Sequence, residues 1–200
     1  YIGIWEGQIK FDKSMPHLNC INFYGIAESL QEPLLLASIN YGDNENDIKT
    51  KIDFSARFIE TFTVKRSINY RKFGQASIKY TMFNVMKLIR NNDLRSLSIN
   101  LSIETEQIDS NWDGVRNFRL HGMNRSFVKH LLSRISSHID NLVGKDTNYT
   151  TYHHPNGKQF EIEQKEWGTK VALSNFIINI TSHLLKNIGV EGIKMKYRKL

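Results

Sequence analysis

The amino-acid sequence predicts a mainly α-helical protein, in which an array of helices is followed by a small segment that contains β structure. Three observations support this class: apolar residues recur every three or four positions over most of the chain, strand-like alternation is rare, and no segment repeats. The 200 residues are 40% hydrophobic and 24% charged, which is ordinary for a globular protein with a buried core. The longest apolar runs are far too short to cross a bilayer, so we expect no membrane partner.

Two helices are predicted in the first half of the chain. One covers residues 28–40, where Pro33 is acceptable only in the first turn because proline lacks the N–H of an interior hydrogen bond. The other covers residues 46–70 and has the clearest pattern in the chain, with Asn46 or Asp47 expected as its N-cap. Its apolar face consists of Ile48, Ile52, Phe58, Ile59 and Phe62.

Further helices follow the same spacing rule, and strands are few. Two apolar stripes consist of Ile78, Met82, Val85, Met86 and Ile89, and of Leu94, Leu97 and Leu101. A longer stripe, ended by Gly144, consists of Phe127, Val128, Leu131, Leu132, Ile135, Ile139 and Leu142. A last helix is predicted over residues 171–187, and short strands over 117–120 and 158–163. The residues before position 28 show no pattern that assigns them to an element.

The charge of the chain is distributed unevenly. Residues 1–110 contain 13 Lys and Arg against 13 Asp and Glu, whereas residues 111–200 contain the remaining 14 against 7. The net charge of +7 therefore lies in the last 90 residues. We expect two regions, a helical one over 1–110 and a basic one over 111–200, and a polyanion such as DNA as the partner of the second. A solvated basic surface without a partner is the alternative.

Cysteine usage favours a cytoplasmic protein. Cys20 is the only cysteine, so the chain cannot form an internal disulfide, and a reducing compartment fits best. No basic and then apolar signal segment opens the chain. Because the sequence begins at Tyr1 without methionine, we expect it to be a piece of a longer protein.

The strongest candidate for chemistry is the predicted strand 158–163. It follows a Pro-Asn-Gly turn and ends in Glu163, whose carboxylate could hold a divalent metal ion against a phosphate. Metal-assisted hydrolysis also needs a base to activate water. Gln164 follows directly, but its amide does not accept a proton near neutral pH. The alternative is an ordinary strand that exposes Glu161 and Glu163 to solvent.

Histidines and basic residues give weaker signals. His153 and His154 are adjacent and point in opposite directions on an extended segment, so a shared metal ion is unfavourable and a polar loop is the simpler interpretation. One expected DNA-binding cluster consists of Lys65 and Arg66, and another consists of Lys194, Lys196, Arg198 and Lys199. A structural role for the first cluster and simple solvation of the second are the competing interpretations. One cysteine cannot build a Cys-based zinc site, and the chain has no glycine-rich phosphate loop.

The order of several motifs resembles the C-terminal part of GmrSD-type, modification-dependent restriction endonucleases, over roughly residues 28 to 164. The motifs are residues 34–39, Lys51-Ile52, Phe58-Ile59-Glu60-Thr61-Phe62, residues 64–69, Ile89-Arg90, Asn117-Phe118, Leu131-Leu132-Ser133-Arg134-Ile135 and Phe160-Glu161-Ile162-Glu163. Each motif is loose, but their order and spacing are fairly specific.

This resemblance implies a phage-defence protein that cuts modified DNA. It implies a mostly helical C-terminal part with an HNH-type, ββα-metal nuclease element, and a nucleotide-binding N-terminal domain or subunit whose signature is not found here. In the family, the first nuclease motif reads Phe-Glu-Ile-Glu-His, so Glu163 matches the acidic metal position, with Mg²⁺ as the expected ion. Gln164 falls on the position of the general base. The resemblance leaves the recognised modification and a homo-oligomeric state open.

Two explanations account for the glutamine at the histidine position. The chain is either a degenerate member that binds DNA or a partner without cutting, or a sequence that lacks the residues after Glu163 in which the histidine lies. We favour the second, because a close match stops abruptly at the catalytic histidine. Under either explanation the nuclease element is incomplete in this chain.

Overall fold

The computed structural model describes residues 2–72, 74–107, 112, 114–118 and 125–153. These residues form α1 (Ile2–Ile9), α2 (Pro16–Phe23), α3 (Glu28–Ala37), α4 (Glu45–Ile68), α5 (Gln75–Ile89), α6 (Leu94–Gln107), α7 (Gly114–Asn117), α8 (Arg125–Leu142) and α9 (Tyr149–His153). Within these ranges there is no strand, which confirms the mainly α-helical class. The predicted strand 158–163 and helix 171–187 lie outside the described residues.

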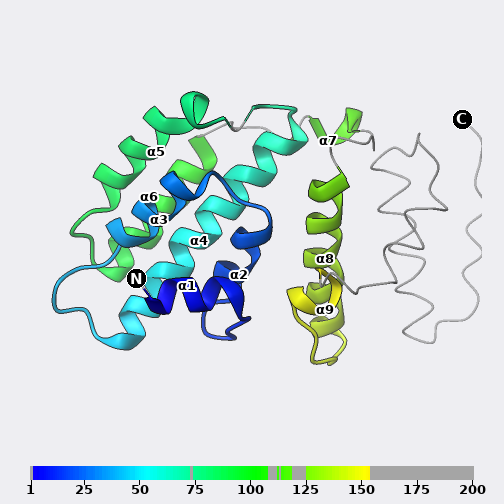
Figure 1. Ribbon diagram of the computed structural model, residues 1–200, viewed down its shortest axis with the longest axis horizontal. Coiled ribbons are helices and arrows are strands. Elements are labelled where there is room, and N and C mark those ends of the chain that lie inside the picture. The colour runs from blue at the N-terminus through cyan, green and yellow to red at the C-terminus, as the bar shows by residue number, and fades with distance from the viewer. Residues whose placement is uncertain (1, 73, 108–111, 113, 119–124, 154–200) are drawn as a thin grey trace, which may run out of the picture.

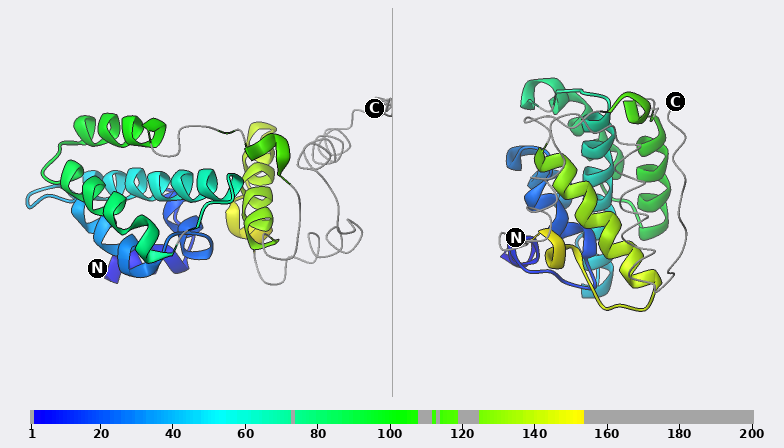
Figure 2. Two further views of the ribbon diagram at one scale, coloured as in Figure 1. Left: turned by 90° about the horizontal axis from the view of Figure 1, so that it is seen from above. Right: turned by 90° about the vertical axis from the view of Figure 1, so that its right-hand side faces the viewer.

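Helix α4 is the centre of the arrangement. It contacts α2 and α3 on one side and α6 on another, and α8 stands beside its C-terminal end (Figures 1 and 2). Helix α5 packs against α3 and α6, and α9 packs against α8. Helix α4 thus contacts both the array α1–α6 and the pair α8–α9, and Phe23 at the end of α2 also packs against His153 of α9.

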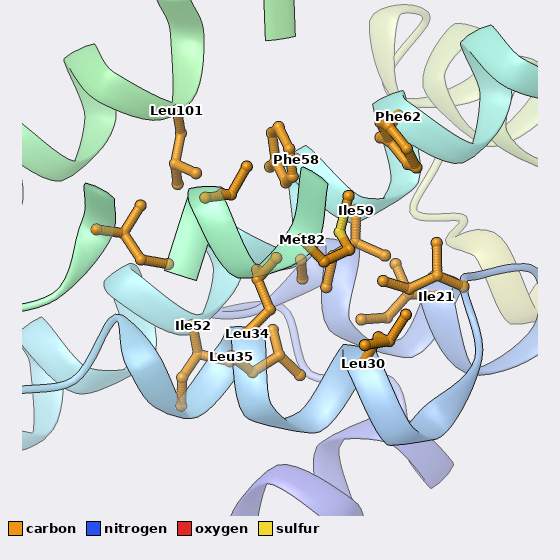
Figure 3. Packing of buried hydrophobic residues seen from close by; sticks show 14 of the residues in the cluster. Ile21, Leu30, Leu34, Leu35, Ile52, Phe58, Ile59, Phe62, Met82 and Leu101 are labelled. Carbon is orange, nitrogen blue, oxygen red and sulfur yellow. The ribbon is translucent and has the colours of Figure 1, made fainter. Parts of the chain in front are cut away.

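The main apolar core lies between α2, α3, α4, α5 and α6 (Figure 3). The predicted stripe of α5 is entirely buried, and Ile52, Phe58, Ile59 and Phe62 of α4 are buried with it. Leu97 and Leu101 add the inner face of α6. Burial of about 1.5–3 kcal/mol per large apolar side chain makes this cluster the main source of stability. The helical spacing in the sequence therefore predicts this core correctly.

Several details of the predictions are wrong. The sequence pattern does not assign α1 and α2, although Pro16 at the first helical position of α2 is a typical helix start. The N-cap of α4 is Asn44, whose side chain accepts the Asp47 N–H at 2.9 Å, and neither Asn46 nor Asp47 has that role. Pro33 lies inside α3 rather than in its first turn.

The strand predicted over residues 117–120 is also wrong at its first residue, because Asn117 is the last residue of α7. The part of this segment that the structure describes is therefore helical or irregular. Residues 119 and 120 lie outside the described part.

A second, smaller apolar cluster joins α8 to the end of α4. Its buried members are Ile68, Phe118, Phe127, Val128 and Leu132, and Tyr24 and Val64 pack against it. The cluster combines residues from both sides of the predicted boundary at 110 and 111. No helix in the described ranges is long and apolar enough to span a membrane.

Candidate functional site

A buried polar cluster lies where α2, α4 and α8 meet, and we call it the Glu60 cluster. It consists of Glu60, His17, His130 and Arg134, with Asp53 at its edge. Glu60 Oε2 lies 2.7 Å from His17 Nδ1, and Glu60 Oε1 lies 2.7 Å from Arg134 Nε. His130 Nε2 lies 3.3 Å from Glu60 Oε1 and is not aligned for a hydrogen bond. One carboxylate thus meets three cationic or imidazole groups from two other helices.

Helix geometry explains why these side chains converge. Asp53 and Glu60 are seven residues apart on α4, so both face the same side of that helix. Asp53 Oδ1 accepts the His17 N–H at 2.8 Å, which satisfies one of the free N–H groups in the first turn of α2. His130 and Arg134 are four residues apart on α8 and share its face toward α4. The cluster therefore fixes α2 and α8 against the same stretch of α4.

The electrostatics favour the ionised form of Glu60. Burial raises the pKa of this carboxyl, but the nearby imidazoles of His130 and His17 and the charge of Arg134 outweigh burial and hold the pKa well below its usual range. Burial raises the pKa of Asp53, in spite of the opposing charge of His17. Burial also raises the pKa of the Cys20 thiol, so this cysteine is not a reactive thiolate.

Aromatic residues surround His130, which is fully buried. Its Nδ1 lies 2.9 Å from the Tyr149 hydroxyl, and the Tyr24 ring stacks on the imidazole with 5.2 Å between centroids. Burial raises the pKa of the Tyr149 phenol. His138, two turns further along α8, is exposed instead. The two histidines of α8 therefore do not form one site.

The arrangement suits the positioning of helices better than catalysis. Both oxygens of Glu60 are occupied by protein groups, and the Glu60 side chain is only 8% exposed. Among the residues that the structure describes, no group of three His, Cys, Asp or Glu side chains is arranged to hold a metal ion. The Glu60 cluster is thus a structural connection between α4 and α8, after which α9 leads into the predicted nuclease segment.

The predicted metal and DNA residues fall mostly outside the described part of the chain. This applies to Glu163 and Gln164, to the basic cluster Lys194, Lys196, Arg198 and Lys199, and to His154. These assignments stay predictions.

Lys65 and Arg66 lie in the last turn of α4. Lys65 is 5% exposed, its ammonium donates to the Thr105 carbonyl, and its Nζ lies 5.5 Å from the centre of the Trp112 ring. Arg66 donates from Nε to the Lys72 carbonyl at 3.0 Å and lies over the Phe62 ring. Phosphate binding by this pair stays a prediction, and Lys65 would have to leave the Thr105 carbonyl to take part.

His153 lies at the end of α9 in an aromatic setting. Its ring stacks on Tyr149 with 4.7 Å between centroids and tilts against Phe23 at 4.8 Å. Burial, with the nearby Lys129 ammonium and His130 ring, lowers the pKa of His153 to about 4. Its Nδ1 is buried and has no hydrogen-bond partner among the described atoms. His153 is thus a neutral, packed side chain at neutral pH.

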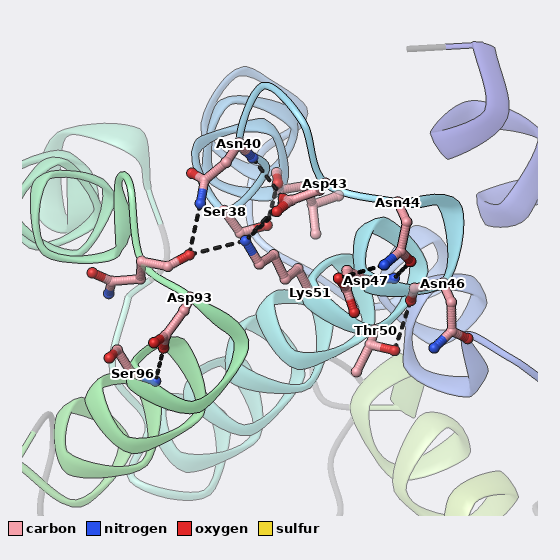
Figure 4. A network of polar contacts seen from close by, with 12 residues as sticks. Ser38, Asn40, Asp43, Asn44, Asn46, Asp47, Thr50, Lys51, Asp93 and Ser96 are labelled. Atoms are coloured by element: carbon pink, nitrogen blue, oxygen red, sulfur yellow. Dashed lines mark hydrogen bonds and ion pairs between the residues drawn. The ribbon is translucent and has the colours of Figure 1, made fainter.

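A second polar cluster fixes the opposite end of α4 (Figure 4). Lys51 is 2% exposed, and its Nζ donates to both Asp43 oxygens at 2.9 and 2.8 Å and to the Asn92 carbonyl at 2.9 Å. Asn40 donates to the same carbonyl at 2.8 Å. The hydrogen bonds from Lys51 lower the pKa of Asp43. Lys51 therefore joins the loop before α4 to the loop between α5 and α6.

A cavity of about 270 Å³ lies between α4 and α6. Phe54, Arg57 and Phe58 line it from α4, and Ser98 and Leu101 are among its α6 residues. None of its lining residues belongs to the Glu60 cluster or to the predicted DNA-binding residues.

Neither a protein-family model nor a curated protein nor a solved structure matches this chain. The resemblance to GmrSD-type endonucleases therefore stays a prediction from the sequence. The periodicity of the sequence indicates neither Glu60 nor His17 as a member of a polar cluster. A signal is present, since Glu60 interrupts the apolar motif Phe58-Ile59-Glu60-Thr61-Phe62 directly beside buried positions.

Proposed function

We propose that the chain is the C-terminal nuclease module of a modification-dependent restriction endonuclease in anti-phage defence. In the complete protein, Glu163 would hold in part a divalent ion, most suitably Mg²⁺, which would supply stabilisation of negative charge for the hydrolysis of a DNA phosphodiester by water. The basic C-terminal half, with Lys194, Lys196, Arg198 and Lys199, contributes salt-dependent affinity for the DNA backbone. The observation that carries the proposal is the Phe160-Glu161-Ile162-Glu163 motif at the end of the ordered series of motifs.

The described helices support this proposal through one contact between distant motifs. Glu60 belongs to the motif at 58–62 and Arg134 to the motif at 131–135, and their side chains form an ion pair of 2.7 Å. Leu132, from the second motif, is buried in the cluster that joins α8 to α4. Two motifs of the resemblance thus act together to hold α8. In the proposed protein, α4 and α8 are packed helices that precede the nuclease segment in the sequence.

The test is cleavage of plasmid DNA by the complete protein. We expect nicking of modified plasmid with Mg²⁺, loss of nicking with EDTA, and no nicking of unmodified plasmid. Glu163→Ala is expected to abolish nicking and to leave DNA affinity within about twofold, because a single ligand to the metal ion is removed while the basic surface stays. Glu161→Ala is the matched control from the same predicted strand and is expected to nick normally. Unchanged cleavage by the Glu163→Ala protein would exclude the metal-site assignment.

A non-catalytic DNA-binding or partner-binding module is the second candidate. It is favoured by Gln164, which stands where the resembling family has its general base. This candidate predicts DNA binding that weakens steeply with salt and no nicking under any metal condition. Metal-dependent nicking by the complete protein would exclude it.

A further inference from the structure

The outer face of α5 has an unusual combination of charge and aromatic groups. No Asp or Glu occurs between Glu60 and Asp93. The same stretch has seven basic residues, namely Lys65, Arg66, Arg71, Lys72, Lys79, Lys87 and Arg90. The equal charge totals of residues 1–110 hide this local excess. A segment without a carboxylate cannot neutralise its own positive charge.

The geometry of α5 places part of this charge on one exposed surface. We define the α5 face as Lys79, Tyr80, Phe83, Asn84, Lys87 and Arg90, which directly follows the helix. These residues recur at spacings of three and four, so they lie on one side of α5. The opposite side, which includes Ile78, Met82 and Ile89, is buried in the main core. All six residues of the α5 face are exposed.

The aromatic rings of the α5 face are open to solvent. Tyr80 is 78% exposed and Phe83 is 42% exposed. Lys79 Nζ lies over the Phe83 ring, 5.5 Å from its centre, so a cation and a ring are already in contact on this face. Within the described ranges, no carboxylate forms an ion pair with Lys79, Lys87 or Arg90. Burial and internal pairing therefore do not explain this set of residues.

We propose that the α5 face binds single-stranded nucleic acid. Lysine and arginine side chains attract the phosphates, and the exposed rings of Tyr80 and Phe83 offer surfaces on which bases stack. Single-stranded nucleic acid fits this face better than duplex DNA, because its bases are unpaired and free to stack on the rings. The residues of the α5 face are different from those of the predicted metal segment 158–163, so the two can be tested with separate variants. As a site for DNA, it extends the proposed function by assigning a strand-binding surface to the helical array.

The experiment measures binding of labelled oligodeoxythymidylate to the complete protein by fluorescence anisotropy at several salt concentrations. Lys79→Ala with Lys87→Ala is expected to weaken binding and to reduce the slope of log affinity against log salt by about 0.7 for each phosphate that the variant no longer neutralises. Tyr80→Ala and Phe83→Ala are each expected to weaken binding about fivefold or more, since each removes a stacking surface. Because these residues are exposed, thermal unfolding should change little.

The matched controls come from α1 and its end. Lys10 is an exposed lysine, and Trp5 is an aromatic residue that is 56% exposed beside Glu6. Lys10→Ala and Trp5→Ala should leave affinity within about twofold. Equal decreases in affinity for the control and the α5 variants would overturn the proposal. The proposal would also be overturned if Tyr80→Ala and Phe83→Ala both left the affinity for single strands unchanged and the protein bound duplex DNA more tightly than single strands.

The result also separates this inference from the nuclease proposal. If the α5 variants bind like the unmodified protein while Glu163→Ala abolishes nicking, the α5 face is excluded and the nuclease assignment stays. If binding depends on the α5 face but the complete protein never nicks modified DNA, the nuclease assignment fails and the α5 face stays.

Discussion

Helices α1–α6 and helices α8–α9 are held in place by different forces. The first region shares one apolar core in which Leu34, Leu35 and Ile59 are fully buried. The second region contacts α4 through a smaller apolar cluster and through the Glu60 cluster. An apolar core tolerates many combinations of residues of similar volume, whereas a buried charge cluster depends on every member. The position of α8 should therefore be more sensitive to single polar substitutions than the packing of the main apolar core.

The variant Glu60→Ala tests this difference between the two regions most directly. The change leaves Arg134 and two histidines without their carboxylate, which is expected to cost about 3–5 kcal/mol in the free energy of unfolding. The lower end is favoured because the Arg134 side chain is 27% exposed and can turn toward water. Urea denaturation measures the decrease. Hydrogen exchange should increase more in α8 than in α5, because α8 loses its polar connection.

Two further variants test whether loss of charge pairing in the Glu60 cluster causes the decrease in stability. Glu106→Ala removes an exposed carboxylate and should change stability by less than about 0.5 kcal/mol. Adding Arg134→Met to Glu60→Ala should restore part of the stability, because the partly buried guanidinium that Glu60→Ala leaves without its carboxylate is then absent. A double variant less stable than Glu60→Ala alone would contradict a role based on charge pairing.

The difference between the apolar core and the Glu60 cluster also explains which features could be predicted from the sequence. The core of α4 and α5 follows from helical spacing, since Ile52, Ile59, Met82 and Ile89 reach one side of a helix whatever their partners are. The Glu60 cluster does not follow, because Glu60, His17 and Arg134 meet only after three helices have packed. Their separations of 43 and 74 residues from Glu60 carry no local pattern. A charged residue inside an apolar motif is nevertheless a signal for a buried pair.

Short helices are the other failure of prediction. The apolar residues of α2, such as Leu18 and Ile21, show little amphipathic order, and tertiary contacts with α4 stabilise the helix. The α5 face is not predicted from the sequence for a different reason. Its charge appears only when Lys79 and Lys87 are counted in their own segment, because acidic residues elsewhere in residues 1–110 balance them in the total.

A milder substitution in the main apolar core gives a reference value for the first region. Ile59 is the direct neighbour of Glu60 on α4, and its side chain is fully buried in the main apolar core. Ile59→Val removes one methylene and is expected to cost about 0.5–1.5 kcal/mol, because surrounding side chains close part of the space. Urea denaturation should show this decrease with an unchanged denaturant slope. A cost for Ile59→Val that exceeds the cost for Glu60→Ala would reverse the proposed difference between the two regions.

The last expected effect concerns His153, whose contribution to stability depends on pH. Its pKa is lowered from the ordinary 6.5 to about 4, so below pH 6.5 the unfolded chain binds a proton that the folded protein does not. Stability should therefore fall as the pH drops from about 6.5 toward 4, by less than about 1.4 kcal/mol for each pH unit. The pKa of Glu60 is also lowered, but its ordinary value of 4.5 confines that decrease in stability to more acidic solutions.

Replacement of His153 by phenylalanine isolates this effect. The ring of His153→Phe can keep the stacking on Tyr149 and Phe23, and the change removes the buried Nδ1 that has no partner among the described atoms. Urea denaturation at pH 7 and pH 5 should show a smaller drop in stability for this variant than for the unchanged protein. His138→Phe is the matched control, because His138 is exposed on α8 and its replacement should leave the drop nearly unchanged. Equal drops in all three proteins would mean that His153 is protonated in the folded state, and the aromatic packing between α9 and α2 would then have to accommodate a charge.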